Sequence, residues 1–302
     1  MSKYIAFTVI FCILLFSTNC NSQTTTTQST QTVTATQEIT TTTPPQHTTQ
    51  SNSVLDIHFI DVGQGDSILI DYGQIEVLID GGDRSPGVVT YLSSFVDGPI
   101  EVMVATHPHA DHIGGLIAVL ENYKVEEVWY NGDESTSKTY QDFMNAVESE
   151  ETETHIARLH DVIQIGDLLF TVRNPADLEG STNNNSIVLH LTYGQVDFLF
   201  MGDAEQEAER DMMMLDSLPV PEVEILKVGH HGSRTASSED FLSITSPEIA
   251  IYMAGEGNTY GHPHEETITA LESIGATIYG TDVNGTIVIH TDGVTYQVTP
   301  ER

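Results

Sequence analysis

The chain has 302 residues, of which 44 are acidic and only 10 are Lys or Arg, which gives a formal net charge of −34 at pH 7. This charge excludes a generally basic surface that would attract nucleic acid or anionic membranes. It indicates a protein kept soluble by its charge or adapted to high salt, in which bound cations would have to draw in any polyanionic substrate.

Residues 1–20 have the pattern of a signal peptide. Lys3 precedes the apolar run Ile5–Phe16, which at about twelve residues is too short to span a bilayer but suits the core of a secretory signal. Cys20 follows in a sequence similar to a lipoprotein cleavage box, although Asn19 replaces the usual small residue. The mature protein is expected to be either secreted or held at the outer face of the cell membrane by a lipid anchor on Cys20, without an internal disulfide or a transmembrane domain.

Residues 21–53 consist mainly of Thr, Gln and Ser. Such a segment cannot bury enough apolar surface to offset the entropy of ordering. This composition predicts a disordered stalk that can carry O-linked glycans.

Residues 54–302 are expected to form one α/β domain. In the first half, apolar and β-branched runs predict strands at Val54–Ile60, Ser67–Asp71, Gln74–Ile79, Ile100–Ala105, Val125–Tyr130 and Thr154–Ala157. Helical spacing of apolar residues predicts helices at Val88–Phe95, Gly114–Asn122 and Lys138–Val147.

The second half repeats this arrangement. Strands are predicted at Val162–Ile165, Leu168–Arg173, Ile187–Tyr193, Val196–Met201, Glu222–Val228, Ile249–Met253, Ala276–Tyr279, Thr286–His290 and Val294–Val298. Helices are predicted at Glu205–Leu215, after the cap Ser238, and at Glu265–Ser273. Two halves of this kind indicate two sheets packed face to face, with helices outside.

The segment Thr106–His112 holds three histidines and one aspartate in an H-x-H-x-D-H pattern. It directly follows a predicted strand, so rigid structure can hold its side chains in place. Imidazole nitrogens and carboxylate oxygens suit zinc, manganese or iron. The spacing favours two adjacent metal ions, and the alternative is a histidine-rich surface loop.

Other polar residues occur where predicted strands end. Asp80, Asp203 and the pair His230-His231 each follow an apolar strand, while His262 ends a loop before a helix. Strand ends on one edge of a sandwich can converge on a single cleft.

The motifs formed by these residues resemble those of the metallo-β-lactamase superfamily. They are most similar to the motifs of the hydrolase domain found in the ComEC family of competence proteins, in a stand-alone form. The segments that carry the resemblance are Phe59–Ser67, Leu78–Gly82, Thr106–Gly115, Asn183–Leu189, Phe200–Glu205, Lys227–Ser233 and Asn258–Pro263. The resemblance covers residues 54–300 or so and implies an αββα four-layer sandwich.

The resemblance also implies two divalent metal ions, Zn²⁺ or Mn²⁺. Its implied ligands are His107 and His109 for the first ion, Asp111, His112 and His262 for the second, and Asp203 as a bridge, with Asp80 orienting a ligand histidine. Many members place a further histidine where this chain has Asn183–Asn185. The first site is then expected to be weaker, to use the amide oxygen of Asn184, or to prefer a harder metal such as manganese.

In the implied mechanism, two cations about 3.5–4 Å apart lower the pKa of a bridging water, which attacks phosphorus or a carbonyl carbon. Asp111 or Asp203 would accept a proton, and His230 or His231 would donate one to the leaving oxygen or bind phosphate. A purely structural loop is the alternative for the histidine pair. Four residues remain open between supporting or substrate roles and structural ones: Asp66, Ser233, Asn258 and Tyr260.

The sequence therefore predicts an exported, metal-dependent hydrolase, expected to be monomeric. A phosphodiesterase or nuclease acting on nucleic acid or nucleotides, linked to DNA uptake or extracellular nucleic-acid processing, is favoured by the resemblance and opposed by the acidic surface. The alternatives are an acyl- or lactam-hydrolysing enzyme and a surface-anchored binding module without catalysis.

Overall fold

The computed structural model describes residues 54–84, 87–150, 152–215 and 217–302. The predicted signal peptide and stalk lie outside the described residues, so both stay predictions. In the part of the chain that is described, no helix has both the length and the apolar character needed to cross a bilayer.

The first sheet has eight strands in the order β15-β14-β1-β2-β3-β4-β5-β6 within the described residues. Its strands are β1 (Leu55–Phe59), β2 (Ile68–Asp71), β3 (Glu76–Ile79), β4 (Ile100–Ala105), β5 (Val125–Tyr130), β6 (Glu153–Ile156), β14 (Ile287–Thr291) and β15 (Tyr296–Pro300). Strands β3 to β6 pair in parallel, and the others pair antiparallel.

The second sheet has the order β13-β12-β11-β10-β9-β8-β7. Its strands are β7 (Val162–Ile165), β8 (Leu168–Asn174), β9 (Val188–Tyr193), β10 (Val196–Phe200), β11 (Ile225–Lys227), β12 (Ile249–Tyr252) and β13 (Thr277–Gly280). Strands β10 to β13 are parallel to one another.

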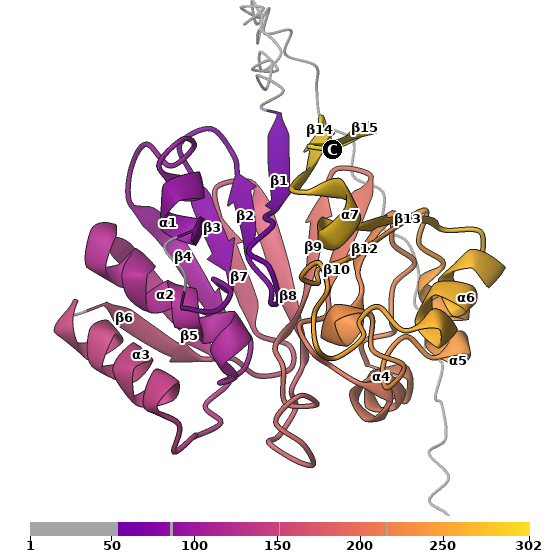
Figure 1. The fold of residues 1–302 in the computed structure, drawn as a ribbon, viewed down its shortest axis with the longest axis horizontal. Coiled ribbons are helices and arrows are strands. Elements are labelled where there is room, and N and C mark those ends of the chain that lie inside the picture. Colours follow the sequence, from indigo (N-terminus) through magenta and orange to yellow (C-terminus); the bar gives the residue numbers. More distant parts are fainter. Residues whose placement is uncertain (1–53, 85–86, 151, 216) are drawn as a thin grey trace, which may run out of the picture. The chain divides into compact units, whose positions relative to one another are not determined.

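Helices cover the outer face of each sheet (Figure 1). Helices α1 (Gly87–Leu92), α2 (Ala110–Asn122) and α3 (Lys138–Ser149) pack on the first sheet. Helices α4 (Gln206–Met213), α5 (Glu239–Thr245) and α6 (Glu265–Ser273) pack on the second. The short turn η1 (Gly229–Gly232) and helix α7 (Thr281–Asn284) complete the described elements.

The main hydrophobic core lies between the two sheets. Phe59 of β1 and Phe200 of β10 meet there with ring centroids 6.3 Å apart. Since helices also bury the outer faces, central strands such as Glu76–Ile79 are buried on both sides, which explains their continuous apolar runs. This arrangement confirms the predicted αββα four-layer sandwich.

Several elements differ from the prediction, and three of these differences are informative. Helix α2 begins at Ala110, so Asp111 lies in its first turn, where a carboxylate is favoured by the positive end of the helix dipole. The strand predicted at Glu222–Val228 contains only Ile225–Lys227. Helix α7 is too short for a hydrophobic period to reveal it.

Candidate metal centre

Polar side chains gather at the edge where several parallel strands end. Asp80 follows β3, Thr106–His112 follows β4, Asp203 lies just beyond β10, and His230-His231 lie beyond β11. Strands β3 and β4 pair in parallel, as do β10 and β11. Each pair therefore presents its carboxyl ends on one side, and the loops that follow can converge.

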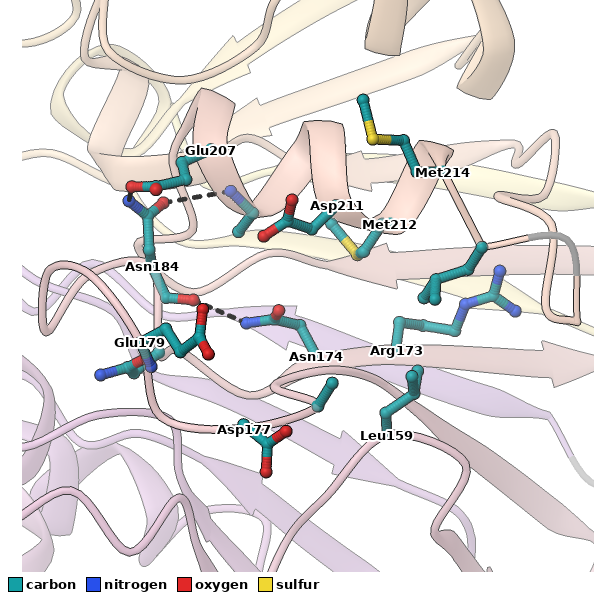
Figure 2. A pocket seen from close by; sticks show the side chains of 14 residues that line it. Leu159, Arg173, Asn174, Asp177, Glu179, Asn184, Glu207, Asp211, Met212 and Met214 are labelled. Atoms are coloured by element: carbon teal, nitrogen blue, oxygen red, sulfur yellow. Dashed lines mark hydrogen bonds between the residues drawn. The ribbon is translucent and has the colours of Figure 1, made fainter. Parts of the chain in front are cut away.

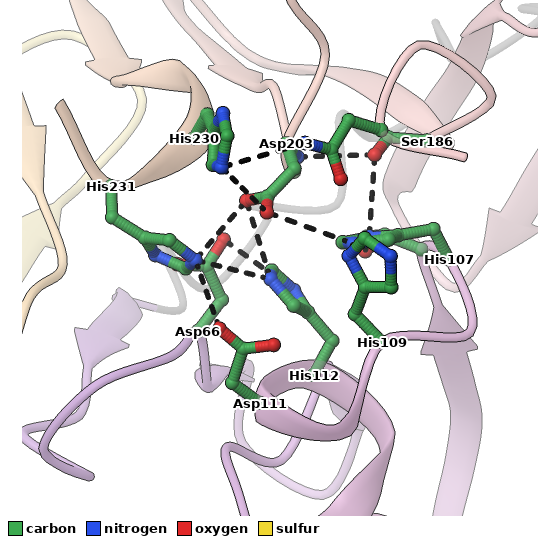
Figure 3. A network of polar contacts seen from close by, with 12 residues as sticks. Asp66, His107, His109, Asp111, His112, Ser186, Asp203, His230 and His231 are labelled. Atoms are coloured by element: carbon green, nitrogen blue, oxygen red, sulfur yellow. Dashed lines mark hydrogen bonds and ion pairs between the residues drawn. The ribbon is translucent and has the colours of Figure 1, made fainter. Parts of the chain in front are cut away.

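A first cluster contains His107, His109 and Asp203, which each offer one ligand atom within 4.8 Å of the other two (Figure 3). His107 Nε2 lies 3.0 Å from His109 Nδ1 and 3.6 Å from Asp203 Oδ2. The other nitrogen of His107 faces the hydroxyls of Thr106 and Ser186. Burial lowers the pKa of His107 well below its usual value, which keeps the ring neutral, as a metal ligand must be.

A second cluster contains Asp66, His112, Asp203 and His231, all buried. Asp203 Oδ1 lies 3.2 Å from His112 Nε2 and 3.3 Å from His231 Nε2. The Asp203 carboxylate thus reaches both clusters, one oxygen facing each (Figure 3). This is the geometry expected for a carboxylate that bridges two ions.

The side chain of Asp80 fixes the orientation of His112. Asp80 Oδ2 lies 2.7 Å from His112 Nδ1, so Nδ1–H can donate to it and leave Nε2 free to face the site. Thr106 donates its N–H and its hydroxyl to the same carboxylate at 2.8 and 2.7 Å. Asp80 has a left-handed backbone with φ 56°, a conformation that Asp tolerates better than most residues.

Gly114 and Gly115 allow α2 to approach the turn after Asp80 closely. A Cβ at Gly115 would lie 1.9 Å from the backbone oxygen of Gly81. The N–H of Gly81 donates to His112 O at 2.7 Å, and Gly115 N–H donates to Gly82 O at 2.9 Å. The Gly-Gly pair after the histidine motif therefore serves to bring His112 against Asp80.

Lys227 is a supporting residue that the sequence reasoning missed. Its side chain is fully buried at the end of β11, where Nζ forms an ion pair with Asp66 and donates to Gly202 O at 3.0 Å. Lysine is almost never fully buried unless it is paired. The sequence does carry a signal for this role, because Lys227 is a charged residue within the apolar strand that precedes His230.

The donors fit divalent cations. Asp203 Oδ1 and Asp66 Oδ1 are buried without a hydrogen-bond partner among the described residues. Burial opposes ionisation of Asp203, but the charges of His231 and His112 outweigh it and hold the carboxyl pKa well below its usual range. Conversely, Asp203 helps to raise the pKa of His112 and of His231 despite burial. Bound cations can replace these imidazolium charges.

Asp111 and His262 line the adjoining cavity of about 380 Å³ but belong to neither cluster. Asp111 Oδ2 lies 3.5 Å from His231 Nε2. The His262 ring stacks on His231 at a centroid distance of 6.1 Å. Burial, with the charges of His230 and His231, lowers the pKa of His262 to about 4. The second cluster therefore contains Asp66 and His231 in place of Asp111 and His262, which the resemblance had implied.

Asn184 does not point into the cavity, contrary to the expectation that its amide oxygen serves the first ion. Its Oδ1 accepts the N–H groups of Glu205 and Ala208 at 3.0 and 3.3 Å, which caps α4, and Nδ2 donates to Glu207. Figure 2 shows this side chain at a separate pocket beside α4. Asn183 lines the metal-site cavity instead, and its buried Oδ1 has no hydrogen-bond partner in the part of the chain that the structure describes.

His230 lies on the other side of Asp203. Its Nδ1 lies 3.1 Å from Glu205 Oε1, and its Nε2 lies 3.8 Å from Asp203 Oδ2. Both His230 and His231 have left-handed backbones, with φ 47° and 55°. This unusual turn directs consecutive imidazoles toward one carboxylate, which regular structure could not do.

Of the remaining predicted residues, Tyr260 lines the cavity, whereas Asn258 and Ser233 do not. Asn258 bonds within its own loop, accepting N–H groups from Tyr260 and His262 and donating to His262 O at 2.6 Å. Its role here is to shape the loop. Ser233 bonds to the Thr235 hydroxyl at 2.9 Å. The Tyr260 ring is 64% exposed and stacks on His262.

A four-layer sandwich with a shared carboxylate between two histidine clusters defines a class of metal-dependent hydrolases. The chain belongs to the metallo-beta-lactamase superfamily, whose family model matches residues 60–256. A solved structure with the same fold, the metallo-beta-lactamase fold protein YhfI from Bacillus subtilis, covers 78% of this chain and 100% of its own, with a TM-score of 0.55 and 12% identity.

Curated relatives carry competence-related names. The chain is 30% identical over 253 residues to ComE operon protein 3 of Bacillus subtilis, which covers 77% of this chain and 32% of the relative. It is 27% identical over 236 residues to Competence protein ComA of Neisseria gonorrhoeae, covering 75% and 31%. The chain thus spans about a third of the length of these relatives, and the predicted similarity to the competence family is confirmed.

Proposed function

We propose that this chain is a phosphodiesterase or nuclease that hydrolyses nucleic acid or nucleotides with two divalent cations, Zn²⁺ or Mn²⁺. The observation that carries the proposal is Asp203, one buried carboxylate that reaches two ligand clusters beside one polar cavity. His107, His109 and Asp203 would hold the first ion. Asp66, His112, Asp203 and His231 would hold the second.

When bound, two cations supply a lowered pKa for water and a clamp on the attacked phosphate. The protein supplies the proton transfers. Asp111 is kept ionised because, although burial opposes it, a hydrogen bond from His231 and nearby imidazole charges hold its pKa below the usual range. It faces the cavity and can accept a proton. His230, oriented by Glu205, can donate one to the leaving oxygen.

The competence names of the relatives support a nucleic-acid substrate and a role at the cell envelope. Secretion, or anchoring through Cys20, belongs to the same proposal, as does a monomeric state. With a net charge of −34, the cations must supply most of the attraction for a phosphodiester, so screening salt should favour substrate binding.

The test is hydrolysis of bis-p-nitrophenyl phosphate, single- and double-stranded DNA and cyclic nucleotides by the full chain, with and without chelator. Nitrocefin tests lactam hydrolysis in parallel. We expect chelator-sensitive cleavage of phosphodiesters only. Turnover of nitrocefin alone would favour an acyl hydrolase, and no turnover with metal bound would favour a binding module.

A pair of variants separates proton donation from metal binding. His230→Gln is expected to lower kcat about 10²- to 10⁴-fold with metal content unchanged. His264→Gln is the control, because the His264 ring accepts from Arg234 N–H and packs against His262 but belongs to neither ligand cluster. Equal activity in both variants would exclude His230 as the proton donor.

A further inference from the structure

Four carboxylates form a row across the first sheet, far from the metal centre. Asp56 of β1 is opposite Asp71 of β2, which is opposite Glu76 of β3. Glu101 of β4 is next to Glu76, since Val77 pairs with Val102. We call these four residues the carboxylate row. Paired residues point to the same face of a sheet, so the four side chains lie in line.

The row lies on the outer face, at the amino ends of β3 and β4. Leu78 and Met103, two positions beyond Glu76 and Glu101, belong to the hydrophobic cluster beneath α1 and α2. Glu76 comes four residues before Asp80, which is about 13 Å along an extended strand. The row is therefore at the opposite end of the strands from the histidine clusters.

Little positive charge faces the row. Asp56, at one end, is paired with His290, whose Nδ1 lies 2.7 Å from Asp56 Oδ1. No Lys or Arg among the described residues forms an ion pair with Asp71, Glu76 or Glu101. Like charges opposite one another on neighbouring strands destabilise a sheet, so this arrangement needs a compensating cation or proton.

Glu76 is the central and least ordinary member. Its side chain is buried, with the residue only 1% exposed, and neither carboxylate oxygen has a hydrogen-bond partner among the described residues. Its own backbone N–H donates to Glu101 Oε2 at 2.7 Å. Burial, reinforced by Glu101, Asp97 and Asp71, raises the pKa of Glu76 to about 7. Two free oxygens next to further carboxylates form an oxygen-only donor set.

We propose that the carboxylate row binds one calcium ion through Glu76, Glu101 and Asp71, separately from the metal centre. Oxygen-only donors select hard cations, whereas the imidazoles of the metal centre suit transition metals. Calcium accepts six to eight oxygens in flexible geometry, with water completing the shell, while magnesium demands a near-ideal octahedron. The carboxylate oxygens of the row do not lie as close together as the ligand atoms of the histidine clusters. Calcium binding therefore requires Asp71 and Glu101, which are only partly buried, to turn toward Glu76.

The test is calcium titration of the full chain whose metal centre has first been loaded with manganese, followed by calorimetry and by melting temperature. We expect one calcium ion to bind, manganese to stay bound, and the melting temperature to rise more than in sodium chloride of equal ionic strength. Calcium affinity should fall as the pH drops through about 7, because protons compete for Glu76.

Two variants decide the assignment. Glu76→Gln should weaken calcium binding at least tenfold and, without calcium, melt above the wild-type chain, because it removes a buried repulsive charge. Glu272→Gln, which removes an exposed charge on helix α6 of the second-sheet layer, should leave calcium binding unchanged. The proposal is overturned if Glu76→Gln keeps wild-type affinity, if calcium only displaces manganese, or if calcium acts no more strongly than sodium.

Discussion

The role of Asp80 gives a quantitative test of how the metal centre is built. Asp80→Asn preserves the shape of the side chain and tolerates the left-handed backbone at φ 56°. The Thr106 N–H still needs an acceptor, so the amide oxygen replaces Oδ1 and the amide nitrogen replaces Oδ2. That nitrogen then meets His112 Nδ1, where the carboxylate had accepted a hydrogen bond at 2.7 Å.

Two donors cannot share one hydrogen bond, so His112 must move its proton to Nε2 or rotate. Either change removes Nε2 as a ligand of the second cluster. Loss of such a supporting partner typically costs 10- to 100-fold in metal affinity, which is about 1.4–2.7 kcal/mol. We therefore expect Asp80→Asn to bind manganese or zinc 10- to 100-fold more weakly than the wild-type chain.

The assay is competitive metal titration against a chromophoric chelator, with bound metal measured after dialysis. Asp83→Asn is the matched control, because Asp83 is exposed and, among the described residues, its Oδ1 accepts only from Arg84 N–H. Wild-type affinity in Asp80→Asn, or an equal loss in Asp83→Asn, would refute the reasoning.

Three further predictions concern the site and the fold. His109→Ala should lose metal from the first cluster and all hydrolytic activity, as measured by metal analysis and phosphodiester turnover. Asn184→Ala removes the acceptor that caps α4, so urea unfolding should show a loss of about 1 kcal/mol at unchanged metal content. Burial lowers the pKa of His58 from 6.5 to about 4. As the pH falls, His58 is therefore protonated in the unfolded chain before it is protonated in the folded chain. The free energy of unfolding should fall by up to about 3 kcal/mol between pH 6.5 and 4. His58→Leu should reduce this fall.

Each of these predictions has a contrary result. Metal and activity retained in His109→Ala would count against the first cluster. Loss of metal from Asn184→Ala would indicate that Asn184 is a ligand of the metal centre. An unchanged pH profile of the unfolding free energy in His58→Leu would show that other groups cause the acid sensitivity.

Most of the fold could be predicted from the sequence, because its strands are buried on both faces and form clear apolar runs. The predicted strand at Glu222–Val228 is longer than β11, since Glu222, Val223 and Glu224 extend an alternating polar and apolar pattern but lie outside the strand. Helix α2 begins at Ala110, before the predicted start at Gly114, because the histidine motif conceals its first turn. Local pattern cannot separate a ligand-bearing loop from a helix that begins inside it.

The candidate site could be predicted in part. The histidine motif and Asp203 do come together, because each follows a strand that ends at the same edge. Asp66 gave no comparable signal, since turns favour Asp for local reasons, and its place is revealed by tertiary contacts with Lys227 and His231. The choice between Asn183 and Asn184 depends on loop direction, which composition does not encode.

The four residues of the second cluster come from both halves of the sandwich. Asp66 comes from the loop before β2 and His112 from helix α2, both in the first-sheet layer, while Asp203 comes from the loop after β10 and His231 from the turn η1 in the second. A cation held among them joins the two layers, and at 100 times its Kd it adds about 2.7 kcal/mol to folding. The supply of metal around the protein would therefore govern how long each molecule lasts as well as how fast it works.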